Sequence, residues 1–200
     1  ADLGDQLAVQ VAEIEPLVPA SVGKYFGDHN YNVVGGQNGE PANPKVTVHI
    51  DDARHFLIKT DQKFDAITSD PLDPWVKGAA TLYTREFFQE VKAHLNPNGV
   101  VTLFVQLYAS NDAAVKSEVA TFLEAFPNGA VFANTINGQG YDLVLFGQLE
   151  DKAIDVDAVQ ARLSAPENAR VAESLRQIGI NSAVELFGTY AGNVKDMKNW

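Results

Sequence analysis

The sequence contains no cysteine among its 200 residues. Disulfides, thiolate-bound zinc, iron–sulfur clusters and cysteine nucleophiles are therefore excluded. No apolar run approaches the roughly 18 residues that a membrane-spanning helix needs. The first residues also lack the charged and apolar regions of a signal peptide. We therefore expect a soluble cytoplasmic protein with no membrane partner.

Positive charge is scarce. Lys and Arg total 15 against 26 Asp and Glu, which gives a formal net charge of -11. Nucleic-acid and anionic-lipid surfaces require clustered basic side chains, so we expect no nucleic-acid partner. An acidic surface attracts cationic ligands instead.

The sequence also has no G-x-S-x-G motif, which argues against a serine hydrolase.

The first three-quarters of the chain alternates short apolar runs with amphipathic segments, a pattern typical of an α/β fold with a parallel sheet. The stretch "NPNG" at 96–99 should end a helix, and "NGQG" at 137–140 should form a tight hairpin turn. Residues 27–44 read as a loop. We expect strands at 6–15, 45–50, 64–70, 100–108, 130–136 and 141–149, and helices at 16–26, 51–60, 84–95 and 112–126.

The composition changes from Glu150 onwards. Residues 155–164, 166–179 and 181–193 each read as a short helix, with Gly and Asn at their ends. We therefore predict two domains, a sheet domain at 1–149 and a helical subdomain at 150–200. No chemistry is recognisable in the second.

Polar side chains lie at or just beyond the ends of four of the expected strands. In an open parallel sheet, ligands bind beyond the carboxyl ends of the strands, so these residues should share one rim. The alternative is structural, because Asp and Glu also favour turns and helix N-termini, where the helix dipole stabilises them by about 0.3–1 kcal/mol. The residues are Glu13 and Glu15, Asp51 and Asp52, Asp70 and Asp73, and Gln106 and Tyr108.

Each of these acids has a plausible task. A carboxylate at one strand end can accept both hydroxyls of a ribose, and one at the next can accept from an adenine amino group. A third, partly desolvated among Pro71, Pro74 and Trp75, could bind an amine and take its proton.

Five segments together resemble the spermidine synthase family of polyamine aminopropyltransferases, and most closely its bacterial spermidine-synthase-like branch. The resemblance covers about residues 9–149. It implies a Rossmann-like, methyltransferase-type fold, decarboxylated S-adenosylmethionine as aminopropyl donor and a polyamine as acceptor. The segments are "VAEIEP" (11–16), "HIDDARHFL" (49–57), "FDAITSDPLDP" (64–74), "AATLYTREFF" (79–88) and "LNPNGVVTLFVQ" (95–106).

The resemblance also implies residue roles. Glu13 matches the ribose-binding acid of the family, and Asp52 matches the acid that meets the adenine amino group. Asp70 matches the acid that deprotonates the attacking amine, and Asp73 matches a polyamine-binding acid. Tyr83 and Gln106 are further substrate-binding candidates near the same rim.

The chain departs from the family pattern in several places. It has no strand with a glycine-rich loop before "EIEP", it lacks the N-terminal β-hairpin of the family, and "DDA" at 51–53 replaces a "GDG"-like turn. We therefore expect an internal fragment, truncated at its N-terminal strand, whose activity is impaired. Loss of a central strand would expose sheet edges, so we also expect a homo-oligomer.

Two other functions remain open. His49, Asp51, Asp52 and His55 lie within seven residues and could hold a catalytic zinc or similar ion in a metal-dependent hydrolase. A calcium ion held by Asp51, Asp52, Asp70 and Asp73 is a further alternative, although our main interpretation requires no metal. The other function is a non-catalytic remnant that binds a nucleoside.

The stretch at 33–39 is glycine-rich, but we interpret it as a flexible loop. Trp75 and Tyr83 either line a substrate channel or cap the core.

Overall fold

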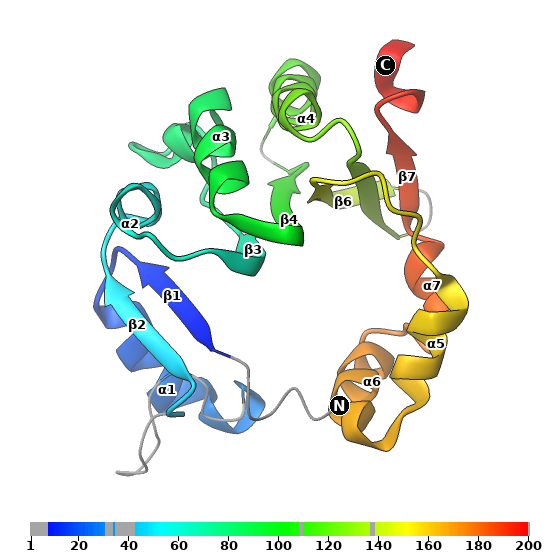
Figure 1. The fold of residues 1–200 in the computed structure, drawn as a ribbon, viewed down its shortest axis with the longest axis horizontal. Coiled ribbons are helices and arrows are strands. Elements are labelled where there is room, and N and C mark those ends of the chain that lie inside the picture. Colours follow the sequence, from blue (N-terminus) through cyan, green and yellow to red (C-terminus); the bar gives the residue numbers. More distant parts are fainter. Residues whose placement is uncertain (1–7, 31–33, 35–42, 109, 137–138, 200) are drawn as a thin grey trace. The chain divides into compact units, whose positions relative to one another are not determined.

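The computed structural model describes residues 8–30, 34, 43–108, 110–136 and 139–199. The chain divides into two compact units, Ala1–Thr60 and Asp61–Trp200. We describe each unit by itself (Figure 1). Within the described part of the chain, no helix is long and apolar enough to cross a membrane.

The first unit holds two parallel strands, each followed by a helix. Its elements are β1 (Val9–Glu13), α1 (Leu17–Asn30), β2 (Val46–Ile50) and α2 (Ala53–Lys59). Glu13 lies opposite Ile50, so both strands end at the same edge. The predicted elements are confirmed, but α1 continues four residues past Phe26, its predicted end. Of the glycine-rich stretch at 33–39, the structure describes only Val34.

The second unit is built on a five-stranded sheet in the order β3-β4-β6-β5-β7. β3 and β4 are parallel, and the remaining neighbours are antiparallel. The predicted hairpin of the last two strands before residue 150 is therefore confirmed, although residues 137–138 lie outside the described part. The strands are β3 (Phe64–Ser69), β4 (Leu95–Gln106), β5 (Ala130–Ile136), β6 (Gln139–Gln148) and β7 (Tyr190–Asn193).

Two helices, α3 (Arg85–Ala93) and α4 (Asp112–Ala125), pack side by side against this sheet (Figure 1). The predicted N-cap of α3 is confirmed, because the hydroxyl oxygen of Thr84 accepts a hydrogen bond from the backbone N–H of Phe87 at 3.2 Å. The apolar face of α3 buries Phe88, whose ring meets that of Phe122 on α4 edge-on at 5.4 Å. This aromatic contact lies in the core of the unit.

Two predictions were wrong. The stretch at 96–99 does not separate helix from strand, since β4 already begins at Leu95. The register between β3 and β4 shifts here, because Phe64 pairs with Leu95 whereas Ala66 pairs with Val100. Asn98, whose backbone is left-handed (φ 62°), lies within this irregularity.

The second error concerns the C-terminal region, where we expected only helices. Residues 190–193 instead form β7, which extends the sheet beside β5. The other elements of this region are α5 (Val156–Ser164), η2 (Pro166–Asn168), α6 (Ala169–Gln177), α7 (Ala183–Phe187) and η3 (Asp196–Asn199). The domain boundary after residue 149 stays a prediction.

Four strands of the described part have a partner on one side only. β1 and β2 pair only with each other, β3 pairs with β4 alone, and β7 pairs with β5 alone. Each therefore leaves a row of backbone N–H and C=O groups without a strand neighbour among the described residues.

Candidate functional site

In the first unit, Glu13 and Asp52 both lie at the carboxyl ends of the two strands. Glu13 is the last residue of β1, and its backbone carbonyl accepts from the N–H of Asp51 at 3.1 Å. One side-chain oxygen of Glu13 accepts from the backbone N–H of Glu15 at 2.8 Å. The parallel pairing of β1 and β2 thus brings the predicted ribose acid and the predicted adenine acid to one edge.

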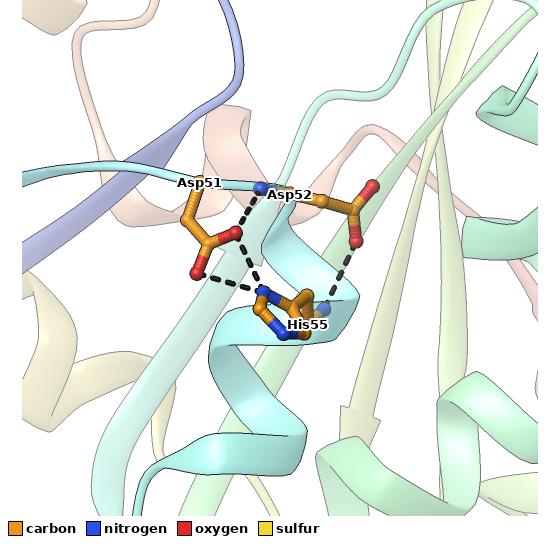
Figure 2. A network of polar contacts seen from close by, with 3 residues as sticks. All are labelled: Asp51, Asp52 and His55. Carbon is orange, nitrogen blue, oxygen red and sulfur yellow. Dashed lines mark hydrogen bonds and ion pairs between the residues drawn. The ribbon is translucent and has the colours of Figure 1, made fainter.

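Asp52 has a structural task as well as its predicted one. It is the N-cap of α2, and its Oδ1 accepts from the backbone N–H of His55 at 2.9 Å (Figure 2). Its carboxylate points away from that of Asp51. A carboxylate that caps a helix is held in one orientation, which would suit the recognition of an amino group.

Asp51 is engaged with His55 one helical turn later. Its two carboxylate oxygens lie 2.7 and 2.9 Å from Nδ1 of His55, and Oδ1 also accepts from the N–H of Asp52 at 2.9 Å (Figure 2). The hydrogen bond from His55 is the main reason that the pKa of Asp51 is lowered.

His49 does not join this group. Its Nε2 lies 2.7 Å from Oε1 of Gln10, and its ring stacks on Phe56 with centroids 4.7 Å apart. Among the described residues, no three His, Asp or Glu side chains gather as metal ligands. The metal-dependent hydrolase and the calcium alternative are therefore not supported.

In the second unit, the loop after β3 carries Asp70 and Asp73. Asp70 is exposed, whereas Asp73 is half-buried and its Oδ1 is fully buried with no hydrogen-bond partner in the described part. Of the two acids near Pro71, Pro74 and Trp75, the structure partly buries Asp73 and leaves Asp70 exposed, and Trp75 is itself 53% exposed. Of the two acids, Asp73 is the more desolvated.

Tyr83 hydrogen-bonds the backbone of this loop. It ends η1 (Ala79–Tyr83), is buried, and places its hydroxyl 3.3 Å from the carbonyl oxygen of Leu72 and 3.5 Å from that of Pro71. Burial raises the pKa of Tyr83, and the negative charges of Glu118, Asp70 and Asp73 raise it further. Three carboxylates thus act on one phenol.

Gln106 lies at the carboxyl end of β4, three residues beyond the partner of Ser69 in β3. It faces Asp142 across the antiparallel pairing with β6. Its Nε2 is buried and, like Oδ1 of Asp73, has no hydrogen-bond partner among the described residues. Buried polar atoms without partners are uncommon and call for an explanation.

Two acids of this region were missed in the sequence. Glu118 on α4 is only 9% exposed, and burial followed by the charge of Asp73 raises its pKa to about 7. Burial, with a smaller contribution from Asp70, raises the pKa of Asp142. A signal for Glu118 existed, since it follows Val115 by three residues and precedes Phe122 by four on the apolar face of α4. Asp142 gave no such signal, because its position opposite Gln106 depends on long-range strand pairing.

An aromatic pair borders these acids. The rings of Tyr108 and Tyr141 lie 5.0 Å apart, and both side chains are about half exposed. Burial raises the pKa of Tyr108, and the charges of Tyr141, Asp73, Asp70 and Asp142 raise it further. A cluster of carboxylates beside phenol rings attracts ammonium groups through charge and through the ring faces.

The six predicted site residues therefore form two groups. Glu13 and Asp52 belong to the first unit, and Asp70, Asp73, Tyr83 and Gln106 to the second. Glu13 and Asp52 lie at the ends of β1 and β2, and Asp70, Asp73 and Gln106 at the ends of β3 and β4. Tyr83 contacts the loop after β3 through its hydroxyl.

The chain matches the spermine/spermidine synthase domain over residues 8–157. A polyamine aminopropyltransferase of Enterobacter sp. (strain 638) is 35% identical over 92 residues, which make up 46% of this chain and 29% of that protein. The corresponding protein of Salmonella newport (strain SL254) is 34% identical over the same shares. The match thus spans less than a third of the length of these relatives.

Solved structures show the same fold. A spermidine synthase from Thermotoga maritima superposes with a TM-score of 0.61 at 20% identity, over 76% of this chain and 50% of that one. Human methyltransferase-like protein 13, in complex with SAH, gives a TM-score of 0.55 at 22% identity, over 85% and 70%. The predicted Rossmann-like, methyltransferase-type α/β fold is therefore confirmed.

Proposed function

Because the chain belongs to the spermine/spermidine synthase domain family, we propose that it binds decarboxylated S-adenosylmethionine and transfers the aminopropyl group to an amine of a polyamine. The curated relatives are named polyamine aminopropyltransferases. A spermidine synthase that superposes on this chain with a TM-score of 0.58, at 18% identity over 76% of this chain and 49% of its own, was crystallised with the transition state analogue AdoDATO. The names of the curated relatives and of this crystallised spermidine synthase both support the proposal.

The arrangement at the ends of β3 and β4 carries the proposal. Asp70 and Asp73 follow β3, Gln106 ends its parallel neighbour β4, and Tyr83 hydrogen-bonds the loop between the two acids. A neutral amine attacks the carbon next to the donor sulfonium, a C–N bond forms, and the C–S bond breaks to release a neutral thioether. The amine must give up one proton, and we assign its acceptance to the exposed carboxylate of Asp70. Asp73 and Gln106 would hold the acceptor in line.

In the first unit, we assign donor recognition to Glu13 and Asp52. Glu13 would accept hydrogen bonds from the ribose hydroxyls, and Asp52 would accept one from the adenine amino group. The Asp52 cap uses Oδ1, so Oδ2 would remain for the ligand.

The test is turnover of the donor with putrescine, followed by mass spectrometry of spermidine and the released thioether nucleoside. Asp70→Asn should lower turnover by about 10²–10⁴-fold, as expected for loss of a general base, and should leave donor binding unchanged. Asp65→Asn is the matched control, because Asp65 is an exposed acid on β3. Turnover that survives Asp70→Asn would show that the base is wrongly assigned. Donor binding without turnover in the unmodified chain would favour the non-catalytic remnant.

We also propose that the chain forms a homo-oligomer in the cytoplasm. The edges of β1, β2, β3 and β7 that have no strand neighbour among the described residues support association, because an unpaired strand edge can pair with another chain. Light scattering at micromolar concentration tests this, and a monomeric mass would contradict it.

A further inference from the structure

Glu118 stands out among the described acids of the second unit because it is buried. It is 9% exposed, and the only charge that shifts its pKa is the like charge of Asp73. The groups whose charges act on it or respond to it are Asp73 from the loop after β3 and Tyr83 from η1, which α4 contacts. A buried carboxylate facing a second carboxylate and a phenol lacks a counter-charge within the protein.

Three acids around Tyr83 differ in depth. Asp70 is exposed, Asp73 is half-buried, and Glu118 is buried. All three raise the pKa of the same phenol, so they lie near it. Of the three, the assigned base Asp70 is the most exposed and Glu118 the most buried.

Buried polar atoms without partners occur in the same region. Oδ1 of Asp73 and Nε2 of Gln106 are inaccessible and lack hydrogen bonds within the described part. Buried polar groups are normally satisfied. An ammonium group could donate to Oδ1 of Asp73, whereas Nε2 of Gln106 needs an acceptor, such as the lone pair of a neutral amine. The unpartnered atom of Gln106 points to a polar ligand independently of the acids.

Resting on the proposed function, we propose that Glu118 is a specificity-determining residue that binds the distal, non-reacting amino group of the acceptor. The reacting amine would meet Asp70 at the surface, and the other end of a diamine would reach inward to Glu118. The site would therefore select acceptors with a second amino group over monoamines of the same length.

Proton linkage provides one readout. With a pKa of about 7, Glu118 is about half protonated at pH 7. An ammonium group against it favours the carboxylate, so binding of a diamine should release up to about half a proton at this pH. A monoamine bound at Asp70 should release much less.

The experiment is calorimetry of the 200-residue chain with putrescine and with butylamine, each in two buffers of different ionisation enthalpy. We expect the unmodified chain to bind putrescine at least about tenfold more tightly than butylamine. Glu118→Gln should weaken the binding of putrescine at least about tenfold and change the affinity for butylamine less than about twofold. It should also abolish the proton release. Glu124→Gln is the same change on the exposed side of α4. It should alter neither the affinity for the two amines nor the proton release.

The outcomes separate the two proposals. Binding of neither amine by the unmodified chain would overturn the proposed function together with this inference. Diamine selectivity that survives Glu118→Gln would overturn the role of Glu118 alone. Diamine binding without proton release would also overturn it, and this measurement needs no variant. Circular dichroism would verify that Glu118→Gln is folded.

Discussion

The hydroxyl of Tyr83 donates a hydrogen bond to the carbonyl oxygen of Leu72 at 3.3 Å. Leu72 lies between the two acids of the β3 loop, so this buried phenol hydrogen-bonds the backbone segment that joins them. The loop itself is exposed at Asp70 and Leu72. Its geometry therefore depends on a residue more than ten positions later in the chain.

Replacing Tyr83 by Phe removes this bond without removing the ring. We expect a loss of about 0.5–1.5 kcal/mol in the free energy of unfolding and a several-fold weaker binding of putrescine. Urea denaturation and calorimetry measure the two effects. Tyr190→Phe is the control, because it deletes a similar hydroxyl bond, to Asp196 at 3.0 Å, in the C-terminal region. Equal loss of amine binding in both variants would contradict a specific role for Tyr83.

Asp52 combines helix capping with its proposed role in donor binding, and two substitutions separate them. Asp52→Asn keeps a good N-cap but removes the charge, so stability should stay within about 0.5 kcal/mol while donor binding weakens. Asp52→Ala should lose both, with about 1 kcal/mol of stability. Thermal unfolding and donor titration are the measurements. If Asp52→Asn binds the donor as tightly as the unmodified chain, Asp52 acts only as a cap.

Asp73 is assigned to acceptor binding and Asp70 to proton transfer, so their variants should differ in kind. Asp73→Asn should raise KM for putrescine about tenfold and leave kcat nearly unchanged, whereas Asp70→Asn should mainly lower kcat. Steady-state kinetics on both variants provide the comparison. A pure kcat effect in Asp73→Asn would show that the two roles have been interchanged.

The raised pKa of Glu118 predicts a pH dependence of stability. The folded state binds a proton more tightly (pKa about 7) than an unfolded chain with the ordinary value of 4.5. Stability is therefore fully present below about pH 4.5 and is lost as the pH rises towards and through 7. Glu118→Gln should lack this loss and be more stable than the unmodified chain at pH 8, by roughly 1–3 kcal/mol. Urea denaturation between pH 4.5 and 8 tests this, and parallel curves for the two proteins would contradict it.

The sequence predicted the elements whose signals are local. The Thr84 cap and the apolar face with Phe87, Phe88 and Val91 lie within one helix, and the structure confirms both. Strands β1 to β6 were also recognised, because each combines an apolar run with turn residues at its ends.

The sequence did not predict features that depend on distant partners. β7 has only four residues and is a strand because β5 offers it a free edge. Burial of Glu118 depends on the packing of α4 against η1, and the exposure of Asp70 depends on how the loop leaves β3. Each of these is decided by tertiary contacts rather than by a local pattern.

The pairing of β5 with β7 also bears on how the chain folds. Ala130 lies opposite Asn193, although 63 positions separate them in the sequence. The β5–β6 hairpin needs only a short loop to close, whereas β7 must pay the closure entropy of a much longer one. During synthesis, the outer edge of β5 would therefore stay open until residues 190–193 have emerged. Over that interval the nascent sheet would be most exposed to mispairing with other strands.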